Sequence, residues 1–401
     1  MGALERFLRY VEIDTSSYKE VKEKPTSQGQ VELLKLLMTE LEELGIEAIY
    51  HEVGYVTAKI PANVKGKKKV GFLAHVDTVK VANDGKVNVR TVVFNGTNID
   101  YDNGLQINLS TNPELEGRAG EEIIVTDGQT ILGKDDKSGI AIIMTVAEIL
   151  VNNPDIPHGD VMIAFTTDEE WGRGVEGFDV EAFGADVGYT LDGGEVGEIE
   201  YHNFCGGNAI LKIEGVPAHT GYAKNKMINA INVLGDFMEL FPVNERPATT
   251  EGFEGFYHFY KVEGAMATAS AEIMIRDFFT EKYEERKQFV LDCVAKINEK
   301  YNREVITCTF EDKTKNMYEK VKDHMYLVDY AKRAYEIHGI KPIEQPVRGG
   351  TDGARLSFKG LPCPNLAAGG GNAHSQMEYL PIKDLKTMTD VMLTIIKLFA
   401  E

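Results

Sequence analysis

The 401 residues of this chain exceed what one ordinary hydrophobic core supports, so we expect two domains. Lys plus Arg total 43 and Asp plus Glu total 63, and the resulting net charge of −20 argues against nucleic acid or an anionic membrane as a partner. Four widely spaced cysteines exclude a disulfide framework and a thiolate zinc site. With no signal peptide and no long uncharged apolar run, we expect a cytoplasmic protein.

Apolar runs and helical patterns alternate along the first part of the chain. A helical spacing of apolar residues from Val31 to Leu41 stops at Gly45, a residue type that ends helices. Short apolar runs then predict buried strands at 70–74, 161–165 and 187–191, and a glycine-rich segment near the end supplies a last strand. This alternation predicts an α/β domain with a mostly parallel sheet flanked by helices.

Residues 207–312 have a different pattern. A strand is followed by a helix with Met227, Ile231, Leu234 and Met238 on one face, then by two strands, a second helix and a closing strand. Ala269, Ala271, Ile273 and Ile275 alternate cleanly along one strand. The order β-α-β-β-α-β predicts an inserted ferredoxin-like α+β domain, leaving 1–206 and 313–401 as the catalytic domain.

Five clusters of His, Asp or Glu stand beside the predicted strands. Ligands in open α/β sheets bind in the crevice at the carboxyl ends of the strands, so we expect these clusters to meet. The clusters are His75 to Asp77, Asp135 to Lys137, Asp168 to Glu170, Asp192 to Gly194, and His374 in a glycine-rich loop.

Each cluster alone has a structural explanation, but the combination indicates a metal site. Asp135 and Asp136, for example, suit the N-cap of a helix that begins at Ser138. Together, two histidines and three carboxylates suit two Zn²⁺ ions per chain, with Co²⁺ or Mn²⁺ as alternatives. One of the adjacent Glu169 and Glu170 can bind metal while the other takes a proton from the attacking water.

The segments HVDTV, LGKDDKSG, TTDEEWG, LDGG and the late glycine-rich histidine resemble the co-catalytic zinc exopeptidase family, which includes aminoacylase, glutamate carboxypeptidase and peptidase T. Resemblance to the peptidase T branch runs the length of the chain, in segments such as EIEYHNF, AKNKMINA and RGGTDGARLSFKGLPCPNL. Lys134, Thr220, Tyr222 and the loop NAHSQMEYL depart from the usual pattern of that branch.

The resemblance implies a role for each residue of the site. Asp135 would bridge the two metals, His75 and Asp192 would complete one site, and Glu170 and His374 the other. Asp77 would hold His75 in its metal-binding tautomer, and Glu169 would be the general base. The resemblance also implies a cis peptide bond between Asp135 and Asp136.

Three further residues are predicted to contact the substrate. By resemblance, His219 would stabilise the oxyanion, reached by closure of the inserted lid domain or from the partner subunit of a homodimer formed through it. Arg276 and Arg348 match positions that would hold the substrate carboxylate. For the two arginines, structural ion pairs with Asp277 and Asp352 are the alternative.

The sequence thus predicts a metal-dependent aminopeptidase that releases the N-terminal residue of tripeptides by attack of a metal-bridging hydroxide. A related di-zinc carboxypeptidase or N-acyl amino acid deacylase is the second interpretation. A non-catalytic metal or peptide binder is the third, and the intact Glu169 argues against it.

Overall fold

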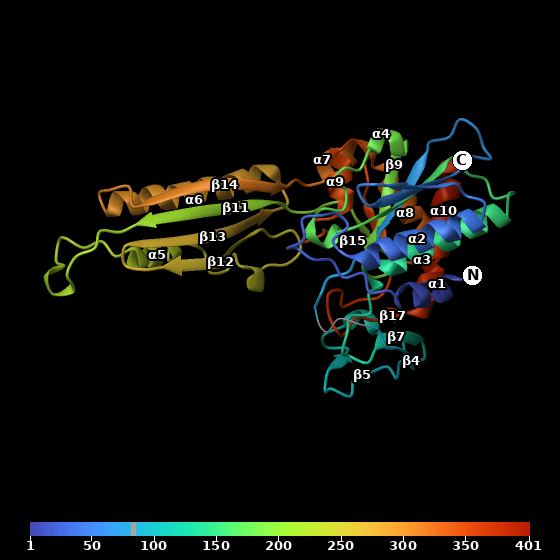
Figure 1. The fold of residues 1–401 in the computed structure, drawn as a ribbon, viewed down its shortest axis with the longest axis horizontal. Coiled ribbons are helices and arrows are strands. Elements are labelled where there is room, and N and C mark those ends of the chain that lie inside the picture. Colours follow the sequence, from blue (N-terminus) through green and yellow to red (C-terminus); the bar gives the residue numbers. More distant parts are fainter. Residues whose placement is uncertain (82–85) are drawn as a thin grey trace. The chain divides into compact units, whose positions relative to one another are not determined.

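The computed structural model describes residues 1–81 and 86–401, which form two compact units (Figure 1). The first unit comprises Met1–Tyr201, Met317–Gln345 and Thr351–Glu401, and the second His202–Asn316 and Pro346–Gly350. The domain boundaries expected at 207 and 312 fall inside two strands, β11 (Cys205–Glu214) and β14 (Ile306–Thr314). Both strands belong entirely to the second unit.

An eight-stranded mixed sheet forms the centre of the first unit. The predicted strands at 70–74, 161–165 and 187–191 are confirmed and almost wholly buried, because each is a continuous apolar run. In the middle of the sheet, the strand pairs β8–β3, β3–β9 and β9–β16 are parallel. The pairs β1–β2, β2–β8 and β10–β16 are antiparallel. The sheet order is β1 (Ala48–His51), β2 (Tyr55–Ile60), β8 (Val161–Thr166), β3 (Val70–His75), β9 (Val187–Gly193), β16 (Asn365–Ala367), β10 (Glu198–Glu200) and β15 (Ile343–Glu344).

Helices pack against this sheet, and α3 (Lys134–Asn152) lies against both β3 and β9. It is buried along nearly its whole length because its sequence is apolar on all sides. No helix in the described part of the chain is long and apolar enough to cross a membrane. The other helices of this unit are α1 (Ala3–Tyr10), α2 (Gln28–Glu43), α4 (Val180–Phe183), α7 (Tyr318–Val321), α8 (Tyr326–Ile337), α9 (Asp352–Phe358) and α10 (Ile382–Ala400).

The first unit also contains a small three-stranded sheet that the sequence analysis did not identify. Its order is β17 (Leu380–Pro381), β7 (Glu122–Thr126) and β4 (Val89–Val93), and a hairpin of β5 (Asn98–Asp100) and β6 (Gln106–Asn108) shares its apolar core. β7 precedes the loop that leads to α3, and β17 follows the loop that carries His374. Their antiparallel pairing therefore brings two distant parts of the site together.

The second unit has the predicted order β-α-β-β-α-β. Its four-stranded antiparallel sheet runs β12 (Phe256–Gly264), β13 (Thr268–Asp277), β11 and β14, and the helices α5 (Ala230–Met238) and α6 (Thr280–Lys300) contact each other on one face. The alternation predicted along β13 is confirmed: Ala269, Ala271, Ile273 and Ile275 are all buried. The arrangement is the ferredoxin-like fold expected from the sequence.

The face predicted for the first helix of this unit is only partly confirmed: Leu234 is buried as predicted, but the other predicted residues are not among the buried residues of the helix. The helix begins at Ala230, so Met227 lies outside it, and Ile231 and Met238 are 50% and 37% exposed. The buried face carries Ala230, Val233 and Phe237 together with Leu234, a helical stripe that shares only Leu234 with the predicted one. Phe237 sets which face of α5 is buried, because its ring packs against Phe241 and Phe259 in the core of the unit.

Candidate active site

The five predicted ligand residues and Glu169 all lie in the first unit, at the edge where parallel strands end. His75 is the last residue of β3, Asp192 lies near the end of β9, and Glu169 and Glu170 form a 3₁₀ turn shortly after β8. Asp135 stands at the start of α3, and His374 lies in the loop between β16 and β17. The structure therefore gathers residues spread over three hundred positions of the chain.

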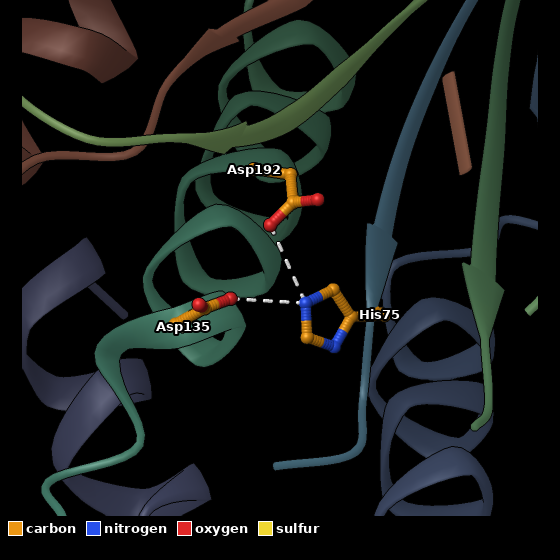
Figure 2. Close-up of side chains that lie close together, drawn as sticks. All are labelled: His75, Asp135 and Asp192. Atoms are coloured by element: carbon orange, nitrogen blue, oxygen red, sulfur yellow. Dashed lines mark hydrogen bonds and ion pairs between the residues drawn. The ribbon is translucent and has the colours of Figure 1, made fainter. Parts of the chain in front are cut away.

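His75, Asp135 and Asp192 converge on one point. Nε2 of His75 lies 3.0 Å from Oδ1 of Asp135 and 3.4 Å from Oδ1 of Asp192, so both carboxylates face the same ring nitrogen (Figure 2). The other nitrogen, Nδ1, is 3.0 Å from the carbonyl oxygen of Asp77 and must carry a proton to donate to it. Nε2 then faces two carboxylates, so it either carries a second proton that it donates to them or gives its lone pair to a cation between them.

A second cluster shares Asp135. Nε2 of His374 lies 2.9 Å from Oε2 of Glu170 and 3.2 Å from Oδ2 of Asp135. The other carboxylate oxygen of Glu170 is buried without a hydrogen-bond partner among the described residues, which is unfavourable unless an ion takes that place. In each cluster the ligand atoms lie within 4.8 Å of one another. Two imidazoles and three carboxylates, one of them shared, fit a pair of borderline divalent ions.

Asp77 connects the two clusters through the backbone. Its Oδ1 accepts a hydrogen bond from the N–H of Glu169 at 2.9 Å, and its Oδ2 accepts one from the N–H of Glu170 at 3.3 Å. Oδ1 is also 3.4 Å from Nδ1 of His75. One fully buried carboxylate thus fixes the ring of His75 and the turn that carries both glutamates.

The start of α3 has an unusual backbone that aims Asp135. The peptide bond between Asp135 and Asp136 is cis, as predicted, and both residues have non-helical backbone angles. Asp136 accepts hydrogen bonds from the N–H of Gly139 at 3.2 Å and from that of His75 at 3.2 Å. The predicted capping role therefore belongs to Asp136, which leaves the carboxylate of Asp135 directed at the two histidines.

The pKa values of the site residues are shifted because carboxylates and imidazoles are buried close together. Burial, with the nearby carboxylates of Asp352 and Asp192, raises the pKa of Glu169 well above its usual range. Burial and the Asp135 carboxylate raise the pKa of Glu170 to about 7. Hydrogen bonds that the ring of His374 donates to the carboxylates of Asp135 and Glu170 raise its pKa to about 10. Although burial alone would raise the pKa of Asp135, the two histidines hold it well below its usual range.

Two sets of side chains that the sequence patterns do not indicate support Glu169 and its neighbour Asp168. Asp168 accepts hydrogen bonds from the N–H and hydroxyl of Thr26 and, at 2.8 Å, from the amide of Gln30, so α2 and the segment before it hold the loop after β8. Arg355, on α9, forms an ion pair with Glu169 at 3.2 Å. No local pattern marks Thr26, Gln30 or Arg355, because their partners are far away in the sequence. Arg355 alone lies in one of the quoted peptidase T-like segments, RGGTDGARLSFKGLPCPNL.

His219, Arg276 and Arg348 belong to the second unit. His219 is exposed, and its Nδ1 accepts a hydrogen bond from the N–H of Gly221 at 3.2 Å, which leaves the proton of the neutral ring on Nε2. The ring of Tyr222, 74% exposed, lies 5.2 Å from that of His219.

The two arginines do not form the ion pairs given as alternatives. Arg276 donates from Nη1 to the carbonyl oxygens of Gly207 and Ile275, while Asp277 pairs with Arg286. Arg348 donates from both terminal nitrogens to residues 250–254, with a bond of 2.6 Å to the carbonyl oxygen of Gly252. Its guanidinium also lies over the ring of Phe204 at 5.1 Å, which explains why 346–350 belongs to the second unit.

The chain resembles known peptidases over most of its length. Peptidase family M20/M25/M40 matches residues 126–398. A peptidase T of Clostridium perfringens is 44% identical over 400 residues, which cover 99% of this chain and 98% of the relative. The crystal structure of aminopeptidase PepT from Bacillus cereus superposes with a TM-score of 0.79 at 24% identity, covering 100% of this chain and 98% of that one. A Bacillus subtilis protein described as a dinuclear metal binding peptidase from the M20 family gives a TM-score of 0.68 at 15% identity, covering 99% and 97%.

Proposed function

The chain is a metallopeptidase that belongs to peptidase family M20/M25/M40, and on that premise we propose that it is an aminopeptidase that releases the N-terminal residue of tripeptides. The observation that carries the proposal is the 44% identity to a peptidase T along nearly the whole chain, with the predicted ligands and base gathered at one edge. The second interpretation, a carboxypeptidase or deacylase of the same family, would use the same cluster.

Five side chains are proposed to hold two divalent ions, of which zinc suits the ligands best. His75 and Asp192 would bind one ion, Glu170 and His374 the other, and Asp135 both. When bound, such ions supply Lewis-acid chemistry, which lowers the pKa of water and withdraws electrons from a peptide carbonyl.

Glu169 is proposed as the general base. It is 8% exposed, adjoins the ligand Glu170 in the chain, and belongs to neither ligand cluster. Its carboxylate would take a proton from the attacking water and return it to the leaving amine.

His219 is proposed to stabilise the oxyanion. The hydrogen bond from the N–H of Gly221 to Nδ1 supports this role, because it leaves the proton of the neutral ring on Nε2, where it can be donated to an oxyanion. Of the two arginines, Arg276 is the better-supported partner for a substrate carboxylate, since its bonds to the protein use only Nη1. Both terminal nitrogens of Arg348 already donate hydrogen bonds within the protein, to the carbonyl oxygen of Gly252 and to the hydroxyl of Thr250.

Three compounds test the proposal: a free tripeptide, its N-acetylated form, and an N-acyl amino acid. We expect loss of the first residue from the tripeptide in a reaction that a chelator stops. The acetylated peptide should be a poor substrate, because acetylation removes the free amine. The protein group that would pair with that amine would then be buried without a partner. Preference for either acylated compound would assign the chain to the second interpretation.

A further inference from the structure

Arg355 links two buried carboxylates beside the site. Its Nη1 lies 3.2 Å from Oε1 of Glu169 and 3.5 Å from Oδ1 of Asp352. The side chains of Glu169 and Asp352 are 9% and 5% exposed, and that of Arg355 is 29% exposed. A guanidinium keeps its charge at all relevant pH values, so it can hold both carboxylates at once.

Asp352 is itself fixed from two directions. It is the first residue of α9, whose N-cap Thr351 bonds the N–H of Gly353. Its Oδ2 accepts a hydrogen bond of 3.0 Å from the hydroxyl of Thr166, the last residue of β8. β8, which leads to the turn of Glu169 and Glu170, therefore also holds Asp352 in place.

The loop that follows the 3₁₀ turn of Glu169 and Glu170 passes very close to the side chains of Arg355 and Asp352. A Cβ at Gly172, where φ is +72°, would lie 2.5 Å from Nη2 of Arg355. A Cβ at Gly174 would overlap the carboxylate of Asp352. Two glycines thus allow the backbone to close directly over Arg355 and Asp352.

We propose that Arg355, held by Asp352, is a positioning residue that keeps the Glu169 carboxylate turned toward the metal-ligand cluster. Asp77 fixes the backbone of Glu169, and Arg355 fixes Oε1 of its side chain, which leaves the other oxygen to exchange the proton. Glu169 and Asp352 line a cavity of about 10 Å³ together with His75 and Asp192, so the held carboxylate borders the cluster. This inference rests on the proposed role of Glu169.

The test compares Arg355→Ala and Arg355→Lys with the wild type, and uses Arg333→Ala as a matched control. Arg333 is an exposed arginine of the same unit that pairs with Glu401. We expect Arg355→Ala to lower kcat by roughly 10–100-fold, with KM and metal stoichiometry unchanged, because a misdirected base costs rate and not substrate binding. Arg355→Lys and added guanidinium, below the concentration that unfolds the protein, should each restore part of kcat. The control should respond to neither.

Crystal structures of the metal-loaded wild type and Arg355→Ala give a readout other than activity. We expect the carboxylate of Glu169 to change rotamer in the variant while the ligands stay in place. An unchanged rotamer of Glu169 overturns the proposal, and so does an unchanged kcat. So does a loss of kcat that matches a loss of bound metal, or a rise in KM alone, which would make Arg355 a substrate-binding residue.

Failure of the proposed function is a separate result. A wild type that hydrolyses only an acylated compound refutes the tripeptidase assignment, and the kcat comparison is then made on that compound. A wild type that hydrolyses none of the three leaves the two crystal structures to decide the role of Arg355.

Discussion

Glu169 and Glu170 are neighbours in one turn, yet their surroundings differ, which supports the separate functions proposed for them. Glu170 faces His374 at 2.9 Å, whereas Glu169 faces Arg355 and lines the cavity shared with His75 and Asp192. The same residue type can therefore act as a metal ligand at one position and exchange a proton at the next.

Substituting each glutamate by glutamine tests this division. Glu169→Gln should lower kcat by roughly 10²–10⁴-fold with both ions still bound, since it removes only the base. Glu170→Gln should weaken metal binding, because an amide is a poorer ligand than a carboxylate. Metal analysis after gel filtration, together with kcat, separates the two effects. If Glu169→Gln loses metal and Glu170→Gln keeps it, the roles are exchanged.

We predict that Asp77 matters for metal binding as much as a ligand does, although it is not among the proposed ligands. Asp77→Ala removes the acceptor for the N–H groups of Glu169 and Glu170 and a partner of His75. We expect metal affinity to fall by roughly 10–100-fold, the usual cost of losing such support. Competition with a chelating dye measures it.

The matched control is Asp127→Ala. Asp127 is a half-buried aspartate outside both ligand clusters, and its carboxylate also accepts a backbone hydrogen bond, from the N–H of Gln129. Equal metal affinity in Asp77→Ala and in this control would show that the turn and His75 hold their positions without Asp77.

At the scale of elements, the start of α3 depends on close backbone packing. A Cβ at Gly139 would overlap the carboxylate of Asp136 and the carbonyl oxygen of Leu191, the residue before Asp192. The first turn of α3 therefore packs against the end of β9 only because this position has no side chain.

Gly139→Ala should lower the free energy of unfolding by about 1–3 kcal/mol, the usual cost of overpacking. It should also weaken metal binding, since Asp135 and Asp192 flank the contact. The control is Gly235→Ala in α5, where a Cβ would meet nothing within 4 Å. That change should stabilise the second unit by about 0.5–1 kcal/mol, as alanine does in a helix. Chemical denaturation measures both. Equal stability of Gly139→Ala and wild type would contradict the packing argument.

At the scale of the whole molecule, each unit has its own hydrophobic core, and all proposed metal ligands belong to the first. An ion that binds only the folded state stabilises it by about 2.7 kcal/mol when its concentration is a hundred times Kd. Removing metal should therefore destabilise one unit alone.

Calorimetry of the full chain tests this expectation. We expect two unfolding transitions, of which a chelator lowers one and leaves the other unchanged, and readdition of Zn²⁺ should reverse the shift. A Glu170→Gln variant should show the lowered transition even without chelator. A single transition, or an equal shift of both, would show that the units unfold together.

Local patterns in the sequence were enough to predict the buried strands, the alternation along β13 and the residues that meet at the site. Strand periodicity is a local property, and the carboxyl ends of parallel strands meet at one edge, so polar residues after those strands must converge.

Only the tertiary structure decided which residues act around the site. Arg355 and Glu169 are separated by 186 positions, and Asp168 meets Gln30 across 138. The same holds for the face of α5, which Phe237 sets by packing, and for Arg348, whose carbonyl partners lie about a hundred positions earlier. A side chain pairs with whatever the fold brings within hydrogen-bond distance, and no spacing along the chain encodes that distance.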